Sequence, residues 1–510
     1  MRVYSAAQIH ALDRAAEAAG ISPGELMGRA ADGVVRVVVD RFPDARSALV
    51  LCGPGNNGGD GYGVAARLLG RGLTVLVLEV SAQPRTVEAR AERESFVSSG
   101  GVCRALTSAL LSDALNAAPD LVVDALFGVG MKRSLEGELA AAVAMLNEAV
   151  GPKVVSVDVP SGVDADSTAL SDVHVRADLT VQLAGHKLAS LCHPARTAYG
   201  ETTLVDLGIP ADIMDAGSDT LLVDEHTAGT WLTNRAPDAN KYSAGTVCVV
   251  AGSDQYLGAA ELACRGAWRG GAGLVTLVVP VVGNDRFAGA WPETIFAPWD
   301  SEAWPPTTLS SKLAGSLVVG PGLAPRVAAR LNEFLSWAPG PVVIDAAALG
   351  PEVLDDCVRQ GQLGQTPDSA MRVVTPHAGE AARILGTSAA EVATKPLEAA
   401  HEISRRLGSI CVLKGPTTVI ADPSGRAAIS TFGHPGMASG GTGDVLAGLL
   451  GALLADPAAG GDLFTTVAAG VAAHSLAGQI AAEERGRSLI ASDLVESLPL
   501  ALRRLSGGRW

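Results

Sequence analysis

Residues 48–61 read Ala48-Leu-Val-Leu-Cys52, followed by Gly53-Pro-Gly-Asn-Asn-Gly-Gly-Asp-Gly61. The unbroken apolar run predicts a strand that is buried on both faces of a parallel sheet. The glycines predict a tight turn into a helix that begins near Tyr62. Their spacing satisfies the G-x-G-x-x-G pattern, at which backbone amides can hold a phosphate. This strand–turn–helix stretch predicts a doubly wound α/β fold.

Similar apolar runs alternate with helical stretches along most of the chain. Capping boxes at Ser5 and Ser22 predict that the chain opens with two helices. In the first half, strands are expected at 48–52, 74–80, 121–124, 154–160 and 180–183. The alternation weakens over 211–240, where no strand is expected, and it returns at 246–251, 275–280, 316–320, 342–345, 373–375, 411–414 and 418–421. The expected fold class is α/β with two domains, residues 1–218 and 222–510, whose boundary lies within 215–225.

The composition narrows the class of protein. The 510 residues are 48% hydrophobic and 18% charged, which supplies enough apolar material for packed cores. A formal net charge of -15 argues against a nucleic-acid partner, although backbone amides can still bind anionic small molecules. Seven cysteines without a C-x-x-C motif argue against a disulfide framework. With no signal pattern, and with apolar stretches interrupted before about 18 residues, we expect a cytoplasmic homo-oligomer without a membrane partner.

Polar residues stand where three of the expected strands end. Asp124 closes one strand, Asp158 closes another, and Asn57 lies in the glycine turn after the first. Because the ligand crevice of an open α/β sheet lies outside the carboxyl ends of its strands, these side chains are expected to converge. Oxygen atoms of Asn57, Asp124 and Ser161 suit a hard cation. Asp158, placed beside an epimerisable carbon, can act as a general acid or base.

A dinucleotide-binding dehydrogenase domain is the competing interpretation of this half. The turn has the fingerprint spacing, and Glu79 closes the next strand at the distance expected of a ribose-binding acid. Two observations argue against it. Asn56, Asn57 and Asp60 crowd polar side chains into a turn where a pyrophosphate needs none, and no Walker lysine follows.

A second glycine-rich turn, Gly440-Gly-Thr-Gly-Asp444, marks the other half of the chain. Consecutive glycines at a helix start direct several amides to one point, which predicts a site for a phosphoryl group. Asp444, in the first helical turn, is placed to take a proton from a substrate hydroxyl. Further turns after expected strands, at 320–324, 375–380 and 414–418, predict substrate and nucleotide contacts that include His377.

The first half resembles the YjeF-type N-terminal domain of the NAD(P)H-hydrate epimerase family, over about residues 1–215. The similarity lies in Lys187 and in the stretches Val3-Tyr-Ser-Ala-Ala-Gln-Ile9, Asn56-Asn-Gly-Gly-Asp-Gly61, Val123-Asp-Ala-Leu-Phe-Gly128, Asp158-Val-Pro-Ser-Gly-Val-Asp164 and Asp206-Leu-Gly-Ile-Pro210. The segment Gln182-Leu-Ala-Gly-His186 departs from the family, in which a Phe is expected there.

The resemblance implies the residues of an epimerase site. It makes Asp158 catalytic and assigns Asn57, Asp124 and Ser161 to a potassium ion. It assigns the hydrated nicotinamide nucleotide, derived from NADH or NADPH, to Asn56, Asn57, Gly58, Gly59, Asp60, Gly128, Val129, Gly130, Met131, Lys132, Arg133, Ser134 and Asp158.

The second half, over about 225–505, resembles the ribokinase-like superfamily and within it the NAD(P)H-hydrate dehydratases. The similarity lies in Lys241-Tyr-Ser-Ala-Gly245, Val319-Gly-Pro-Gly-Leu323, Thr375-Pro-His-Ala-Gly-Glu380, Lys414-Gly-Pro-Thr-Thr418 and the Gly440–Asp444 turn. The resemblance implies ADP with Mg²⁺ as the phosphoryl source and Asp444 as the catalytic residue. It assigns the hydrate to Ala259, Gly322, His377 and Asp444, and the nucleotide to Lys414, Gly415, Pro416, Thr417, Thr418 and Gly443.

One departure in the second half concerns the chemistry. The family usually reads D-A-D-A-L-N after the strand at 342–345, whereas this chain keeps Asp345 and has Ala347 and Gly350 in place of the second Asp and the Asn. If the second acid supports the site through water or a metal, its loss lowers efficiency. Asp444 is unaffected.

The interpretation is a bifunctional repair enzyme. One domain interconverts the R and S epimers of hydrated NADH and NADPH, and the other dehydrates the S epimer with ADP, giving AMP and phosphate. Two alternatives remain open from the sequence. One is an ATP-dependent small-molecule kinase with a regulatory nucleotide-binding domain, and the other is a non-catalytic scaffold.

Overall fold

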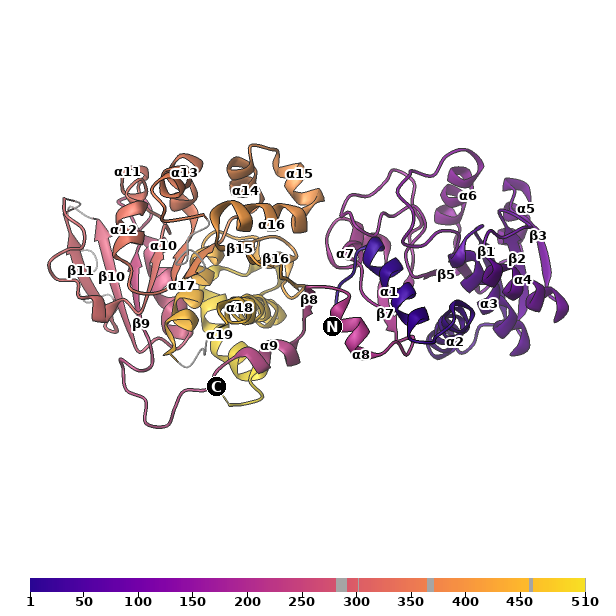
Figure 1. Ribbon diagram of the computed structural model, residues 1–510, viewed down its shortest axis with the longest axis horizontal. Helices are drawn as coiled ribbons and strands as arrows, with labels where there is room; N and C mark the ends of the chain where they lie inside the picture. The colour runs from indigo at the N-terminus through magenta and orange to yellow at the C-terminus, as the bar shows by residue number, and fades with distance from the viewer. Residues whose placement is uncertain (281–290, 301, 365–370, 458–461, 510) are drawn as a thin grey trace. The chain divides into compact units, whose positions relative to one another are not determined.

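The structure is a computed structural model that describes residues 1–280, 291–300, 302–364, 371–457 and 462–509. The chain divides into two compact units, Met1–Leu221 and Leu222–Trp510, drawn from indigo to magenta and from magenta to yellow in Figure 1. The division falls inside a short strand, β8 (Thr220–Val223). The expectation of no strand over 211–240 is therefore wrong. β8 is only four residues long, and its polar flanks conceal it in the sequence.

The first unit is built on a seven-stranded sheet in which every pairing is parallel, with strand order β3-β2-β1-β4-β5-β6-β7. Its strands are β1 (Ser47–Cys52), β2 (Thr74–Glu79), β3 (Val102–Ala105), β4 (Leu121–Ala125), β5 (Lys153–Val157), β6 (Leu179–Leu183) and β7 (Glu201–Val205). All five expected strands are present. The two that the sequence analysis missed, β3 and β7, are the edges, where the residues are largely exposed and no continuous apolar run is required.

Helices cover both faces of this sheet. They are α1 (Ala6–Ala18), α2 (Pro23–Arg41), α3 (Asn56–Gly70), α4 (Val87–Ser98), α5 (Ser108–Asn116), α6 (Gly137–Glu148), α7 (Leu188–Leu191) and α8 (Ala211–Ala216). The capping box at Ser5 is complete, whereas Ser22 caps α2 alone because Glu25 pairs with Arg29 instead. The helix after the glycine turn begins at Asn56, six residues before the expected Tyr62.

Side chains of β1 show how the core of the first unit forms. Val50 and Cys52 pack with α2 and α3 on one face, and Leu49 and Leu51 pack with α5 and α6 on the other. Burying each leucine contributes about 1.5–3 kcal/mol. The strand is thus apolar at every position because both faces are covered, as the sequence predicts.

The second unit is built on a ten-stranded sheet of order β11-β10-β9-β12-β13-β14-β15-β16-β17-β8. Pairings from β11 to β15 are parallel, and β15–β16 and β16–β17 are antiparallel. The strands are β9 (Thr246–Val250), β10 (Leu274–Pro280), β11 (Thr294–Trp299), β12 (Ser316–Val319), β13 (Val342–Ile344), β14 (Arg372–Val374), β15 (Ile410–Leu413), β16 (Thr418–Ala421) and β17 (Ala427–Ser430). All seven expected strands are present, and β8, β11 and β17 were missed.

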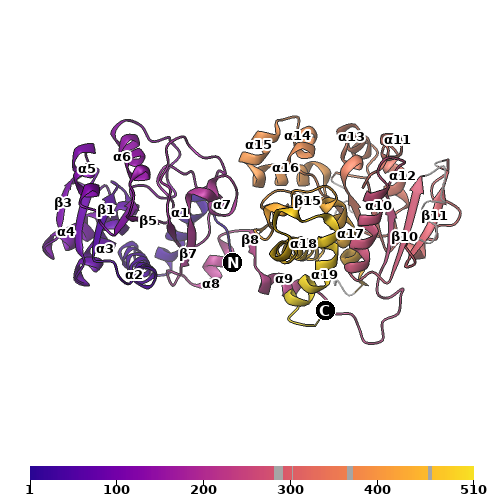
Figure 2. The same ribbon diagram turned by 180° about the vertical axis from the view of Figure 1, so that it is seen from behind.

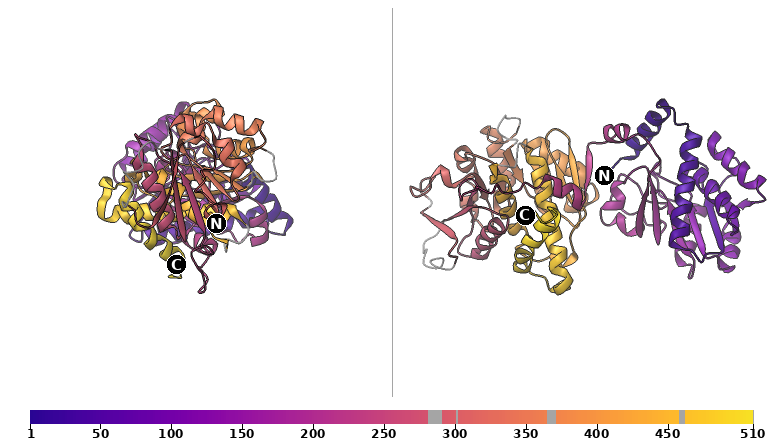
Figure 3. Two further views of the ribbon diagram at one scale, coloured as in Figure 1. Left: turned by 90° about the vertical axis from the view of Figure 1, so that its left-hand side faces the viewer. Right: turned by 90° about the horizontal axis from the view of Figure 1, so that it is seen from below.

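Two helical layers enclose this sheet, and Figures 2 and 3 show them from other sides. One core cluster joins the sheet to α10 (Leu257–Arg269), α17 (Thr442–Ala455), α18 (Leu463–Arg485) and α19 (Ala491–Leu505), and α9 (Glu225–Trp231) lies beside them. The other joins it to α11 (Pro325–Ala328), α12 (Leu331–Trp337), α13 (Pro351–Arg359), α14 (Ala378–Leu385), α15 (Ala389–Thr394) and α16 (Pro396–Leu407).

Helix α18 corrects one inference from the sequence. The window 463–488 is apolar and long enough to cross a membrane by length and composition, although we expected every apolar stretch to be interrupted earlier. In the structure 78% of the apolar 18-residue window within this helix is buried. A helix that is apolar all round is typical of a protein core, and α18 packs among α17, α19 and the sheet.

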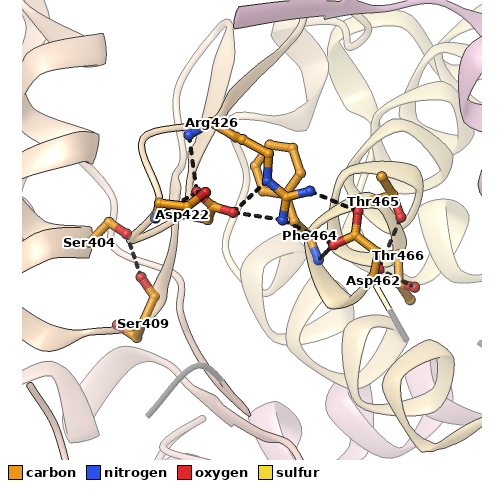
Figure 4. Close-up of polar contacts among 9 residues, drawn as sticks. Ser404, Ser409, Asp422, Arg426, Asp462, Phe464, Thr465 and Thr466 are labelled. Atoms are coloured by element: carbon orange, nitrogen blue, oxygen red, sulfur yellow. Dashed lines mark hydrogen bonds and ion pairs between the residues drawn. The ribbon is translucent and has the colours of Figure 1, made fainter. Parts of the chain in front are cut away.

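An arginine anchors the antiparallel end of the sheet to α18 (Figure 4). Arg426, in the turn between β16 and β17, donates to Asp422 within the turn and to both carboxylate oxygens of Asp462, the N-cap of α18. Its guanidinium also lies 4.6 Å from the ring centroid of Phe464. This cluster fixes the entry of α18, whose His474 contacts the second candidate site.

Candidate active sites

The first candidate site lies where the strand order of the first sheet reverses, between β1 and β4. This is the position at which open α/β sheets bind ligands. A pocket of about 650 Å³ opens there. Residues contributed by α1, α3, the segment after β4 and the segment after β5 line it, including Asp13, Asn57, Gly128 and Asp158.

Asp124 lies beneath this pocket and is fully buried. Its carboxylate accepts hydrogen bonds from the Ser161 hydroxyl at 2.6 Å, the Ser161 amide at 2.9 Å, the Ser156 hydroxyl at 2.9 Å and the Leu126 amide at 3.3 Å. Burial raises the pKa of Asp124, and these hydrogen bonds oppose the shift. Asp124 therefore fixes the position of Ser161, whose oxygen also accepts from the Phe127 amide at 2.9 Å.

Asn57 reaches the same place from α3. A Cβ on Gly128 would lie 3.3 Å from the Asn57 side-chain oxygen, so the amide packs against the segment that follows β4. The Asn57 amide nitrogen is buried and has no hydrogen-bond partner among the described residues. Asn57 and Asp158 line the same pocket, and the Ser161 hydroxyl lies between the Asp124 carboxylate and the Phe127 carbonyl.

The sequence-derived substrate residues of this half divide into two groups. Those that line the pocket are Asn56, Asn57, Asp60, Gly128, Val129, Gly130, Met131 and Asp158. Those outside its lining are Gly58, Gly59, Lys132, Arg133 and Ser134. The last three are exposed.

Gly58 and Gly59 have a packing role. A Cβ on Gly58 would lie 1.9 Å from the Gly53 carbonyl oxygen, and one on Gly59 would lie 2.6 Å from Met27. Only glycine permits the start of α3 to approach the turn this closely. These two glycines shape the site without facing the pocket.

Asp158 combines backbone strain with a buried ion pair. Its φ of 67° is in the left-handed region, which a non-glycine residue occupies at a cost of about 1–3 kcal/mol. Lys187, which is 0% exposed, donates to Asp158 Oδ1 and, at 2.7 Å, to the Leu183 carbonyl. The Leu183 amide also donates to Oδ1, at 3.0 Å. No hydrogen bond reaches Oδ2 from the described residues, so that oxygen remains available at the pocket.

Two more features of this site were not read correctly from the sequence. Asp13, from α1, lines the pocket, and burial raises its pKa. The only signal for Asp13 in the sequence is that it is a single acidic residue on a helix whose other positions indicate packing. Lys187 was recognised only through the family resemblance, and its pairing with Asp158 was not predicted.

Glu79 does not face the pocket. Both of its carboxylate oxygens accept hydrogen bonds from Arg93, at 2.7 and 2.8 Å, and the Tyr62 hydroxyl donates to one of them at 2.8 Å. Glu79 is 5% exposed and is not among the lining residues. The carboxylate is therefore committed to a structural ion pair, which removes the main support for the dehydrogenase interpretation.

The second candidate site lies at the carboxyl ends of β12 to β15. Asp345, directly after β13, is 2% exposed and accepts from the Thr375 hydroxyl at 2.7 Å and from Lys414 Nζ at 2.7 Å. Burial lowers the pKa of Lys414, but the nearby carboxylates, Asp345 first among them, outweigh this effect and raise it. Lys414 is thereby held as a fixed ammonium group.

Asp444 lies in the first turn of α17, as expected. Burial and the charge of Asp345 raise the pKa of Asp444 to about 7, and Lys414 opposes the shift. A Cβ on Gly443 would lie 3.3 Å from Lys414 Nζ, so the ammonium faces the start of the helix. Gly441, at φ 94°, makes the turn that no other residue type adopts easily.

His474 supports this helix start from behind. It lies on α18, is 6% exposed, and its Nε2 is 2.8 Å from the Thr442 carbonyl oxygen at the first residue of α17. Burial lowers the pKa of His474 to about 4, so the ring is neutral near pH 7 and donates to that carbonyl. No sequence pattern indicated this contact, because it joins residues 32 apart on two apolar helices.

Ala259 and Gly322 lie next to each other, and His377 follows a residue bonded to Lys414. A Cβ on Gly322 would lie 2.8 Å from the Ala259 Cβ, and the Lys414 amide donates to the Pro376 carbonyl beside His377. The His377 ring, however, caps α14, because its Nδ1 accepts from the Gly379 and Glu380 amides.

Most of the residues expected to bind the nucleotide lie in or beside the turn after Lys414. The residues that depart from the family pattern lie in the turn after Asp345. Gly415 and Pro416 are exposed, Thr417 is buried and Thr418 starts β16. Ala347 lies in a short 3₁₀ helix, Ala346–Leu349, which Gly350 ends. The absent acid and amide therefore belong to the turn that follows Asp345, and the contacts of Asp345 itself are intact.

Comparisons with known proteins agree across the whole chain. Residues 23–189 match the family model described as YjeF-related protein N-terminus, and residues 247–500 match the model for NAD(P)H-hydrate dehydratase. A bifunctional NAD(P)H-hydrate repair enzyme of Moorella thermoacetica is 35% identical over 528 residues, covering 99% of this chain and 97% of that protein. The enzyme of the same name from Escherichia coli is 33% identical, covering 95% and 90%.

A solved structure is also similar. An ADP/ATP-dependent NAD(P)H-hydrate dehydratase from Bacillus subtilis, co-crystallized with ATP/Mg²⁺, is 27% identical with a TM-score of 0.45 and covers 56% of this chain and 98% of its own. The full-length relatives, together with the two family models, decide the assignment. This chain belongs to the family of bifunctional NAD(P)H-hydrate repair enzymes, which join an NAD(P)H-hydrate epimerase to an NAD(P)H-hydrate dehydratase.

Proposed function

We propose that the two activities are divided between the units, with the epimerase in residues 1–218 and the dehydratase in residues 222–510. One observation carries the proposal. Each unit places an aspartate near a lysine at the carboxyl edge of its parallel strands, Asp158 with the buried Lys187 in the first and Asp444 near the partly buried Lys414 in the second. Each edge is where such sheets bind ligands.

In the epimerase, the hydrated nicotinamide nucleotide occupies the 650 Å³ pocket, and Asp158 acts on the hydroxyl-bearing carbon as acid or base. Asn56, Asn57, Asp60 and the 128–131 segment contact the substrate. Lys132, Arg133 and Ser134 are exposed and lie beyond the lining, which suits contacts to the outer part of a long nucleotide.

A potassium ion fits the residues beneath this pocket. The Asn57 amide, the Ser161 hydroxyl and the Asp124 carboxylate supply oxygen donors, which hard cations prefer. Because the described hydrogen bonds already engage both oxygens of Asp124, Ser161 and Asn57 present the freer oxygens. The ion would contribute a fixed positive charge next to the substrate. Melting of the full chain in KCl against choline chloride tests the site, and N57A should abolish any stabilisation that potassium gives.

In the dehydratase, Asp444 removes the proton from the hydroxyl of the S epimer, and the oxygen takes the terminal phosphoryl group of ADP, releasing AMP. Phosphate then leaves with the C–O bond electrons while the neighbouring carbon loses a proton, which restores the double bond. The nucleotide contacts Lys414, Gly415, Pro416, Thr417, Thr418 and Gly443, and Mg²⁺ accompanies its phosphates. Ala259, Gly322 and His377 contact the hydrate.

An assay on the purified R and S hydrates tests this assignment and the choice of nucleotide. With ADP, the S hydrate alone should regain the absorbance of reduced nicotinamide at once, and the R hydrate should do so only after epimerisation. Equal rates with ATP would make the enzyme nucleotide-tolerant. A stable phosphorylated product without NAD(P)H would contradict the dehydratase mechanism.

We also propose a cytoplasmic homo-oligomer. The proposal rests on two large α/β domains with 18% charged residues and on small-molecule substrates that belong to metabolism. Light scattering of the purified chain measures the oligomeric state directly.

A further inference from the structure

Inverting the hydroxyl-bearing carbon of the hydrate requires a proton donor as well as a proton acceptor. Water adds to a reduced nicotinamide at the carbon next to the ring nitrogen, because the nitrogen lone pair stabilises positive charge there. The hydroxyl can therefore leave that carbon as water if it receives a proton, and the ring is left with a C=N⁺ bond. Water that returns on the other face must lose a proton. One carboxyl group on one side of the ring does not serve both steps.

Three aspartates line the epimerase pocket, and they differ in their charge partners. Asp158 is paired with Lys187, which holds Oδ1 and leaves Oδ2 open. Asp60, on α3, makes no hydrogen bond or ion pair through its carboxyl group within the described parts of the chain. Asp60 is only 9% exposed. The pocket thus holds one carboxylate with a dedicated cation and one buried carboxyl group without any.

Among the described residues, the charged groups that shift the pKa of Asp60 are all acidic. They are Asp158 after β5, Asp13 on α1 and Glu92 on α4. Glu92 is itself held by Arg67, and the Lys187 ammonium is committed to Asp158. Burial, reinforced by these carboxylates, raises the pKa of Asp60 well above its usual value. Burial and the neighbouring carboxylates therefore favour the protonated form of Asp60, which is the state that a proton donor needs.

The geometry points to a division of labour in which Asp60 is the proton donor of the epimerase and Asp158 is the proton acceptor. This inference rests on the proposed catalytic role of Asp158. The Asp60 proton moves to the hydroxyl oxygen, the C–O bond breaks with its electrons on the departing water, and the ring nitrogen forms C=N⁺. Water adds to the opposite face, its proton moves to Asp158 Oδ2, and nitrogen regains its lone pair. Reverse turnover or proton exchange with solvent restores the starting state.

Asp13 is less suited to this task. It is only half-buried, and among the groups around it His10, Lys187 and Arg14 lower its pKa, whereas the charged groups that shift the pKa of Asp60 among the described residues are all acidic. Asp13 also lines the pocket, so D13N is the matched variant that removes another acid from the same cavity.

The test compares D60N, D13N and D158N in the full chain, with the R hydrate as substrate and no nucleotide present. D60N keeps the shape of the side chain and removes its proton. We expect kcat to fall about 10²- to 10⁴-fold with KM within about threefold, and we expect D13N to fall far less. A D60N variant that binds the hydrate normally and keeps kcat within about tenfold of the parent would overturn the inference.

Two measurements on the unmodified enzyme test the role of Asp60 as proton donor even if D60N folds poorly. Each inversion in H₂¹⁸O must place one ¹⁸O in the hydroxyl, and inversion without exchange excludes departure of the hydroxyl and with it the role of Asp60. The epimerase rate must also fall where rising pH deprotonates Asp60, and a profile without a basic limb contradicts the inference. An active D158N would instead defeat the proposed role of Asp158.

Discussion

The two sites pair the same residue types in opposite ways. In the first unit, the buried ammonium of Lys187 lies directly on the catalytic Asp158. In the second, Lys414 lies on a neighbouring acid, Asp345, and Asp444 is left without a salt bridge among the described residues. The catalytic carboxylate of the first unit, Asp158, therefore has a lysine paired with it, and that of the second unit, Asp444, has none among the described residues.

This difference matches the two reactions. A base that takes a proton from a hydroxyl works best when its pKa lies near the working pH, and the pKa of Asp444 is about 7. Asp345 and burial produce that value. In the first unit the pocket also contains an uncompensated carboxyl group, Asp60, so the charge pair on Asp158 creates a contrast between two acids in one cavity. The position of the lysine decides which acid at each site has a cation paired with it.

The strongest test of the comparison removes each catalytic aspartate in turn and measures both activities. D444N should lower dehydration of the S hydrate by about 10²- to 10⁴-fold because the base is gone, and it should leave epimerisation near the parent rate. D158N should do the reverse. Both rates are measured on the same preparation with pure epimers. If either folded variant loses both activities together, the two sites are not separate and the comparison fails.

The next largest effect is expected at Lys187. K187M replaces the ammonium with an apolar group of similar length and leaves the Asp158 carboxylate buried without its cation. Breaking a buried pair in this way costs about 3–5 kcal/mol. We expect an earlier melting transition of the first unit, seen by calorimetry, and loss of epimerisation with dehydration preserved.

K187R is the matched control for this change. It keeps the positive charge but asks a larger group to fit a site that is 0% exposed. Recovery of part of the epimerase rate in K187R would assign the effect to charge. An epimerase that works normally in K187M would show that the cation on Asp158 has no part in the reaction.

A smaller effect on dehydration is expected at Asp345, and it concerns the pH dependence of kcat and the KM for the nucleotide. D345N removes a negative charge that raises the pKa of Asp444, so that pKa should fall by about one unit. Dehydration needs the ionised form and is lost as pH falls through this pKa. The acid limb of kcat should therefore move to lower pH. KM for the nucleotide should rise because Lys414 loses its anchor; an unmoved acid limb would refute the electrostatic coupling.

The sequence predicted the sheets well and the charge pairs poorly. Most strands buried on both faces have continuous apolar runs and were predicted, whereas the edges β3, β7, β8 and β11 do not need them and were missed. The sequence analysis also missed β17, which is buried but only four residues long. The start of α3 was placed at Tyr62 because glycines suggest a turn, but close packing of Gly58 and Gly59 extends the helix to Asn56. The pairing of Lys187 with Asp158 joins residues 29 apart through tertiary structure, so local patterns carry no trace of it.

The family resemblance compensated for part of this deficit. It assigned Asp158 and Asp444, and the structure places Asp158 directly after β5 and Asp444 in the first turn of α17, each with a lysine close by. It gave no sign of Asp13 or of His474, which reach the two sites from helices whose sequences show only packing positions. Glu79 was misread for a related reason, since its distance from the turn fits a ribose contact and only the fold reveals Arg93 beside it.

The smallest effect on activity is expected from the third buried pair, Glu79 with Arg93, which lines neither site. E79Q keeps the hydrogen bond from Tyr62 in place but weakens the two bonds from Arg93, which should cost about 1–3 kcal/mol of stability. The melting temperature of the first unit should fall, while kcat and KM of epimerisation remain within about twofold of the parent because the carboxylate does not reach the pocket. A large rise in KM for the hydrate would indicate that Glu79 contacts the ribose, and it would support a dinucleotide-binding role for this end of the sheet. A stable variant with unchanged activity would show instead that only the lysine pairs at the two sites, and not buried ion pairs in general, bear on catalysis.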